Sequence, residues 1–222
     1  MTRLLKILII LALPFFIMLG SARLLTTEQY LALEYGKASF PPDSYGFTQQ
    51  QRLELATVNM RYVRDNLPDD TLANETLDGK PVYSPREVTH MIDVQTAFQT
   101  VWRALWIAFI AILLSGFILW RRGDLSALAS AIQAGGILTV ALISSIALLA
   151  LFAWQVWFDN FHLIFFKPGS WLFAYSNTLI RLFPLQFWMD ATYMISAISF
   201  IGGLLLAFLG WRWRLSLASK EA

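Results

Sequence analysis

The chain has 222 residues, of which 57% are hydrophobic and 14% are charged, whereas soluble domains carry about 25% charged residues; this composition excludes an ordinary soluble domain. A net charge of only +2, without a clustered stripe of Lys and Arg, argues against nucleic acid as a partner. The chain has no cysteine, which excludes disulfides, thiolate nucleophiles and cysteine-ligated metal centres.

Four apolar stretches are long enough to cross a hydrocarbon core about 30 Å thick. In chain order, they lie within residues 1–25, 99–121, 134–158 and 191–211. This pattern predicts an all-α membrane protein with four transmembrane helices. Residues 122–133 are then a cytoplasmic loop between the second and third helices, and residues 212–222 are a cytoplasmic tail.

The basic residues predict the orientation of these helices. Three clusters of Lys and Arg flank helix ends: Arg3 and Lys6; Arg121 and Arg122; Arg212, Arg214 and Lys220. All three clusters lie on one side of the membrane if the chain crosses it four times. The positive-inside rule therefore predicts that both termini are cytoplasmic and that the two long polar or aromatic connections lie outside.

The first apolar stretch has a second interpretation. Basic residues, an apolar run and the small residues Gly20-Ser-Ala22 also fit a cleaved secretory signal peptide. The apolar run is long for such a peptide, and cleavage would leave the sidedness of the other three helices unchanged.

The first outward connection, residues 26–98, predicts a small and mostly helical extracellular domain. Thr48-Gln-Gln-Gln51 has the pattern of a capping box that opens a helix. Ser84-Pro-Arg-Glu87 marks a second helix start, with Ser at the cap, Pro at the first helical position and Glu at the third. Asp78-Gly79 is typical of a turn.

The second outward connection, residues 159–190, is rich in aromatic residues but interrupted by Pro168, Gly169 and Pro184. It is too interrupted to cross the membrane and too apolar to lie free in water, so we expect an interfacial or re-entrant loop. The side chains expected to line a lipid site are Phe161, Phe165, Phe166 and Trp171.

Both histidines of the chain, His90 and His162, fall in these outward connections. Histidine is the residue whose ordinary pKa lets it both take and give a proton near neutral pH. On the helix begun by Ser84, Arg86 and Asp93 share a stripe with His90, and Glu87 lies one turn before it. We therefore expect Glu87 or Asp93 to orient the His90 ring.

The second histidine follows Asp159 by three residues and lies among phenylalanines, where loss of water favours its neutral, basic form. Arg181 lies in an apolar stretch, and it is expected either to extend to the membrane surface or to bind an anion, such as a phosphate headgroup or a developing oxyanion. Two alternatives stay open for the histidines: ordinary interfacial hydrogen bonding, and a metal site of two His and one Asp.

Several stretches together resemble the lipoprotein intramolecular transacylases, a family of bacterial integral membrane proteins formerly of unknown function. They are Ser84-Pro-Arg-Glu-Val-Thr-His-Met-Ile-Asp-Val94, Trp157-Phe-Asp-Asn-Phe-His-Leu-Ile-Phe-Phe166, Trp171-Leu-Phe173 and Leu179-Ile-Arg-Leu-Phe-Pro-Leu-Gln-Phe-Trp188. The order and spacing of the apolar stretches match as well. Two positions depart from the pattern, because Ala174 and Leu185 stand where acidic residues are expected.

The resemblance implies an acyltransferase of the bacterial plasma membrane with its catalytic face outside. Its substrates would be diacylated lipoproteins, whose sn-2 acyl chain moves to the amine of their own lipidated cysteine to give the lyso-form. It implies His90 and His162 as the catalytic pair, membrane lipid as surroundings, and neither cofactor nor metal. We take His162 as the base and His90 as the acid, with Arg181 or a backbone amide at the oxyanion; the reverse assignment of the histidines stays open.

The competing function is a non-enzymatic membrane scaffold or accessory subunit whose external domain binds a partner. It would account for the topology but leaves the grouping of two histidines and an arginine outside the membrane without a role. A transporter is disfavoured because the chain shows no internal repeat and almost no charge within its apolar stretches.

Overall fold

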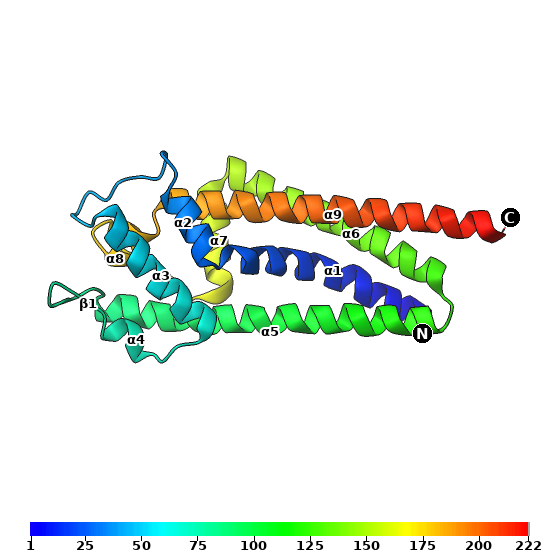
Figure 1. Cartoon of the computed structure of the whole chain (residues 1–222), viewed down its shortest axis with the longest axis horizontal. Helices are drawn as coiled ribbons and strands as arrows, with labels where there is room; N and C mark the ends of the chain where they lie inside the picture. Colours follow the sequence, from blue (N-terminus) through cyan, green and yellow to red (C-terminus); the bar gives the residue numbers. More distant parts are fainter. Residues whose placement is uncertain (222) are drawn as a thin grey trace. The chain divides into compact units, whose positions relative to one another are not determined.

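The computed structural model describes residues 1–221, with side chains to residue 219, so Ala222 at the end of the predicted tail lies outside the described residues. The elements are α1 (Thr2–Leu25), α2 (Glu28–Tyr35), α3 (Gln49–Asp65), α4 (Asp70–Ala73), β1 (Thr76–Leu77), β2 (Lys80–Pro81), α5 (Pro85–Arg121), α6 (Leu125–Phe152), α7 (Trp154–Phe165), α8 (Thr178–Leu182) and α9 (Leu185–Glu221) (Figure 1).

The chain divides into two compact units. The membrane unit comprises Met1–Ala22, Trp102–Phe152 and Tyr193–Ala222, and the polar unit comprises Arg23–Val101 and Ala153–Thr192. The four helices α1, α5, α6 and α9 are each long and apolar enough to cross a membrane. Their number is the one predicted, and apolar side chains such as Trp106 and Ile107 stay largely exposed on them, as lipid-facing residues do.

The predicted boundaries of these helices need correction. Helix α6 begins at Leu125, so only residues 122–124 connect it to α5, and the predicted loop 122–133 is mostly helical. Gly123 makes the tight turn with a φ of 74°, after which small and aliphatic residues continue as helix. The predicted third span, 134–158, ends early because Ala153 leaves the helical conformation and α7 starts anew. The predicted tail is a continuation of α9.

Helices α6 and α9 pack with their backbones nearly touching. A Cβ atom at Gly136 would lie 2.4 Å from the backbone nitrogen of Ala207, and one at Gly210 would lie 2.5 Å from that of Gln133. Small residues permit this approach, which drives helix association where lipid removes the hydrophobic driving force. In the same unit, the Ser199 hydroxyl donates to that of Ser21 on α1 at 3.1 Å.

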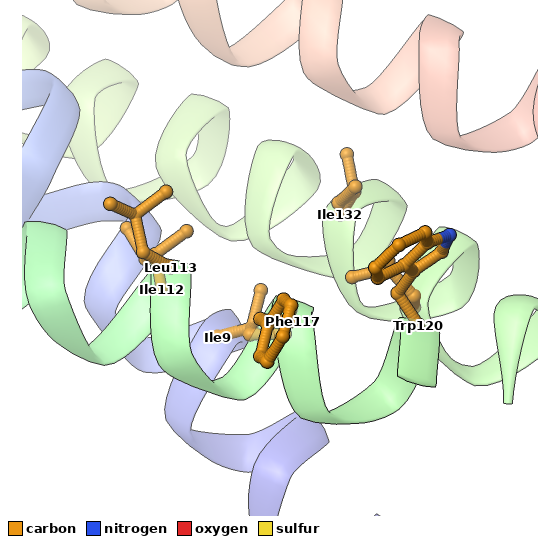
Figure 2. Close-up of a pocket in the computed structure, with 8 residues that line it drawn as sticks. Ile9, Ile112, Leu113, Phe117, Trp120 and Ile132 are labelled. Carbon is orange, nitrogen blue, oxygen red and sulfur yellow. The ribbon is translucent and has the colours of Figure 1, made fainter. Parts of the chain in front are cut away.

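An apolar pocket of about 370 Å³ lies among α1, α5 and α6 of the membrane unit. Figure 2 shows Ile9, Phe117, Trp120 and Ile132 among the side chains that line it. No ionisable side chain lines this pocket, so it offers no acid–base chemistry.

The polar unit has a core of its own around α3. Its buried members are Leu55, Tyr62, Val63, Leu72, Val82, Tyr83, Met91, Leu179 and Leu182. The predicted capping box is confirmed, since Thr48 and Gln51 exchange hydrogen bonds at the start of α3. At the other end of that helix, Gln95 donates to the carbonyls of Tyr62 and Leu67, both at 2.9 Å.

A two-stranded antiparallel hairpin corrects the all-α expectation. Strands β1 and β2 pair Leu77 with Lys80, across the turn that Asp78-Gly79 predicted. Both turn residues have positive φ, 52° at Asp78 and 74° at Gly79, as the favoured two-residue hairpin turns require. The rest of the chain is mostly helical.

The aromatic segment 159–190 is not one loop. It contains most of α7, all of α8 and the start of α9, and only residues 166–177 and 183–184 lie outside helices. Leu179 and Leu182 of α8 are buried in the core around α3. The segment is therefore partly an internal element of the polar unit, because its aliphatic side chains are covered by protein.

Candidate active site

Two helices of the polar unit carry the histidines: His90 lies on the second turn of α5, and His162 lies in α7. Both imidazole rings contact the ring of Phe166. The ring centroid of Phe166 lies 5.2 Å from that of His90 and 5.7 Å from that of His162. The structure thus brings together the two side chains that sequence chemistry singled out.

The His162 ring is oriented by its own helix. Its Nδ1 lies 2.7 Å from the carbonyl oxygen of Phe158, and because a carbonyl only accepts, we assign the proton to Nδ1, which leaves Nε2 with a free lone pair. Burial lowers the pKa of His162, and the hydrogen bond to Phe158 and the charge of Asp159 oppose this only in part. Asp159 itself accepts a hydrogen bond from Gln155 at 2.8 Å.

The His90 ring is enclosed by the rings of Phe166 and Phe173, the latter at 5.4 Å. Its Nδ1 is buried and has no hydrogen-bond partner among the described residues. The pKa of His90 is lowered to about 4, mainly by burial and in smaller part by His162 and Arg86, while the charge of Asp93 opposes the shift. His90 lies outside the membrane-spanning part of α5, which begins at Trp102. With this lowered pKa its imidazole is neutral at pH 7.

Glu87 does not orient His90, contrary to expectation. Its carboxylate accepts hydrogen bonds from the backbone N–H and the hydroxyl of Ser84 at 2.9 and 2.8 Å, and from the N–H of Leu179 at 2.9 Å. The side chain is buried. It therefore caps α5 and ties it to α8, while Asp93 acts on His90 through its charge.

Arg86 holds a loop in place. One guanidinium nitrogen donates to the carbonyls of Gly169 and Leu172 at 3.0 and 2.8 Å, and the guanidinium carbon lies 5.1 Å from the Phe173 ring centroid. Residues 167–173, which we call the 167–173 loop, connect α7 to the approach of α8. Sequence spacing placed Arg86 beside His90 but did not reveal this loop as its partner.

Sequence reasoning did not identify the hydrogen-bonding role of two side chains in the 167–173 loop. The Ser170 hydroxyl and the Trp171 indole nitrogen are buried and have no hydrogen-bond partner among the described residues. The Trp171 ring lies 5.3 Å from that of His162. Trp171 was expected only as a lipid-lining residue, since sequence carries no sign of which indole lacks a partner.

The other predicted lipid-lining residues surround His162 more loosely. The Phe161 ring lies 5.6 Å from His162 and 5.3 Å from Phe165. Phe161 and Phe165 are 38% and 39% exposed, whereas Trp171 is only 9% exposed. We call the rings around the two histidines (Phe161, Phe165, Phe166, Trp171 and Phe173) the aromatic group. It is buried at Trp171 and partly exposed at Phe161 and Phe165.

The structure gives Arg181 a partner other than the oxyanion or headgroup expected from sequence. Its guanidinium donates to both carboxylate oxygens of Asp43, at 3.0 and 2.9 Å, and lies 3.4 Å from the Phe47 ring centroid. The Asp43 side chain is almost fully buried. Its burial favours a higher pKa, but the hydrogen bonds from Arg181 and from the Phe47 N–H outweigh it and lower the pKa.

The alternative of a two-His, one-Asp metal site has no structural support. Among residues with described side chains, no three His, Asp or Glu groups lie close enough together to hold a metal ion. The ring contacts of the two imidazoles are instead with aromatic side chains.

Comparison with known proteins extends these observations. The model of one protein family, Lipoprotein intramolecular transacylase Lit, matches residues 7–188. An Aquifex aeolicus (strain VF5) protein described as uncharacterized is 30% identical over 211 residues, which cover 95% of this chain and 94% of that protein.

Solved structures agree in fold. The membrane-integral lipoprotein intramolecular transacylase Lit from Bacillus cereus has a TM-score of 0.79 at 18% identity, covering 99% of this chain and 98% of that one. A form of the same protein with one histidine replaced by arginine has a TM-score of 0.70, covering 100% of this chain and 95% of that one.

Proposed function

Because the chain belongs to the lipoprotein intramolecular transacylase family, and is thus a membrane acyltransferase, we propose that it moves the sn-2 acyl chain of a diacylglyceryl-cysteine lipoprotein to that cysteine's own amine. His90 and His162 supply the acid–base chemistry. The product is a lyso-form lipoprotein, and the reaction takes place at the outer leaflet of a bacterial plasma membrane.

One observation carries the proposal: two neutral imidazoles from separate helices converge on the Phe166 ring. An ester-to-amide transfer needs a base for the attacking amine and an acid for the departing glycerol oxygen. Positioned acid–base groups contribute about 10²–10⁴ in rate. Since donor and acceptor belong to one substrate molecule, the protein's further task is to hold them in attack geometry.

The two histidines take different parts in this scheme. Nε2 of His162 is free to accept a proton because its Nδ1 faces the Phe158 carbonyl. His90, whose pKa burial lowers to about 4, is a strong acid once it is protonated and gives its proton readily to an alkoxide. His162 is accordingly the base and His90 the acid.

A free α-amino group titrates at about 7.7–8.0, so a fraction of it is neutral amine at pH 7 after it has released one proton to water. The neutral amine attacks the sn-2 ester carbonyl carbon, and its nitrogen loses a proton to His162 as the tetrahedral centre forms. His162 passes this proton on to His90. When the bond to the glycerol oxygen breaks, that oxygen takes the proton of His90, and both rings end the cycle neutral.

The exposed edge of the aromatic group suits the acyl chains. Phe161 and Phe165 present apolar surface beside His162, and hydrocarbon is the ligand that such surface stabilises. With the positive-inside orientation, both termini are cytoplasmic, and the polar unit lies outside together with the histidines.

The test uses the full-length protein in lipid nanodiscs with a diacylated lipoprotein. Because the transfer is intramolecular, the intact mass of the lipoprotein stays constant, while fragmentation shows an N-linked acyl chain and mild alkali releases one fatty acid fewer. A lipoprotein that gains the mass of a whole acyl chain would identify another lipid as donor. An unchanged lipoprotein would favour the scaffold function.

A further inference from the structure

We propose that the Trp171 indole N–H and the Ser170 hydroxyl donate hydrogen bonds to the substrate's ester carbonyl oxygen as it becomes an oxyanion. This inference rests on the proposed acyl transfer and deepens it. It replaces Arg181, which the sequence suggested for this role, with two neutral donors of the 167–173 loop.

The first support is that both groups lack partners where partners are normally found. Trp171 is 9% exposed, and its indole nitrogen, like the Ser170 hydroxyl, is buried without a hydrogen-bond partner among the described residues. Buried donors are nearly always satisfied, and those that are not call for a specific explanation. A ligand oxygen that arrives with the substrate supplies one.

The second support is position. The Trp171 ring lies 5.3 Å from the His162 ring at an interplanar angle of 30°. Nδ1 of His90, whose ring contacts that of Phe166, is likewise buried without a partner among the described residues. The base, the acid and the unpartnered indole of Trp171 therefore border the same group of aromatic rings, and Ser170 directly precedes Trp171 in the loop.

The third support is rigidity, because an oxyanion site stabilises charge only when its donors are oriented beforehand. Arg86 clamps the 167–173 loop through the carbonyls on both sides of Ser170 and Trp171, those of Gly169 and Leu172. The Ser170 N–H also donates to the Lys167 carbonyl at 3.1 Å. These hydrogen bonds use backbone groups of the loop, so they do not involve the Ser170 hydroxyl or the Trp171 indole N–H.

Two arginines of the polar unit are engaged elsewhere. Arg181 forms two hydrogen bonds with Asp43, and Arg86 is directed at backbone carbonyls. Neutral donors suffice here, since both are buried and act on charge that develops only in the transition state.

In the reaction, the amine nitrogen forms a bond to the ester carbonyl carbon, and the π electrons of that carbonyl move to its oxygen. Trp171 and Ser170 donate hydrogen bonds to this oxygen and keep their protons. The electrons return as the carbon–oxygen bond to glycerol breaks, so the two residues end the cycle unchanged, and the protons travel only through His162 and His90.

The experiment replaces the indole N–H without changing the shape of the ring. Trp171→β-(3-benzothienyl)alanine, introduced in the full-length protein, has sulfur in place of N–H. We expect kcat for N-acylation of a diacylated lipoprotein in nanodiscs to fall about 10²–10³-fold, with KM nearly unchanged, because the lost bond forms in the transition state. Ser170→Ala should likewise lower kcat by about 10²–10³-fold, the usual cost of losing one oxyanion donor.

The matched control is the same replacement at Trp188, in the same segment. Its indole N–H donates to the Phe183 carbonyl at 3.1 Å on the surface, where water can replace it, so kcat should stay within about twofold of wild type. Thermal unfolding of each variant shows whether it is folded.

The outcomes separate the two proposals. If wild type performs the transfer and the Trp171 and Trp188 replacements have equal kcat, the donor role is wrong and the transacylase function stands. A rise in KM alone at Trp171 would also overturn it, since it would show a lipid-packing role. If wild type performs no transfer, the proposed function itself fails.

Discussion

Glu87 accepts a hydrogen bond from the backbone N–H of Leu179 at 2.9 Å, which ties the first turn of α5 to α8. This bond fixes the turn that precedes His90 to the element that follows the 167–173 loop. The carboxylate that sequence spacing offered as a partner for the histidine is thus part of the scaffold around the site.

Removing this carboxylate should cost stability. Glu87→Ala leaves the Leu179 N–H and the Ser84 hydroxyl without their buried acceptor, which costs about 1–3 kcal/mol for each such group. Glu87→Gln keeps one oxygen and should be milder. Thermal unfolding in detergent measures the difference; a Glu87→Ala variant as stable as wild type would contradict the assigned bonds.

Replacing either histidine should remove activity without unfolding the protein. His90→Gln and His162→Gln should each lower the rate of lyso-form production by about 10²–10⁴, the usual contribution of an acid–base group. Asn160→Ala is the control, because this exposed side chain on α7 bonds only to the Val156 carbonyl of its own helix. Full activity in both histidine variants would end the proposal.

The pH dependence follows from two imidazoles with lowered pKa. Burial lowers the pKa of His90 to about 4 and lowers that of His162 as well, so both stay neutral as the pH falls below the ordinary histidine value of about 6.5. Between those values the unfolded chain binds more protons than the folded one, so stability is present above about pH 6.5 and is lost as the pH falls toward 4.

The free energy of unfolding, measured by chemical denaturation in steps of about one pH unit between about pH 4 and 7, tests this dependence. His90→Gln should flatten the decline, because one of the two titrating rings is gone. The activity profile should instead rise toward pH 8, since the substrate amine titrates at about 7.7–8.0. An activity limb at the ordinary histidine pKa would contradict the buried, neutral rings.

Arg181 and Asp43 should matter for stability and little for chemistry. Arg181→Met leaves a buried carboxylate without its partner, which costs about 3–5 kcal/mol when one member of a buried ion pair is removed. Arg181→Met combined with Asp43→Leu removes the unpaired charge and should recover much of the loss. Activity per folded molecule should match wild type; a selective fall in kcat in the double variant would restore Arg181 to the active site.

Gly136 should tolerate no side chain in the membrane unit. A Cβ there would lie 2.4 Å from the backbone nitrogen of Ala207, so Gly136→Leu must separate α6 from α9. Gly20→Leu is the control, since a Cβ at Gly20 meets nothing within 4 Å. Thermal unfolding in detergent should show a large loss for Gly136→Leu and little change for Gly20→Leu.

Local features of the chain were predictable from sequence. The number of transmembrane helices follows from the lengths of apolar runs, because a helix satisfies its own backbone within one segment. The capping box at Thr48 and the turn at Asp78-Gly79 involve neighbours within a few residues. The two histidines were identified as candidates by their chemistry, since no other side chain of the chain ordinarily titrates near neutral pH.

The partners of the polar groups were decided by tertiary structure. Glu87 pairs with Leu179, Arg181 with Asp43, and Arg86 with the 167–173 loop, each across a long separation in sequence. Whether Trp171 has a partner likewise depends on which distant elements surround its ring. A sequence pattern records periodicity and caps within a turn or two, whereas the bonds of buried polar groups depend on contacts that exist only once separate helices have packed.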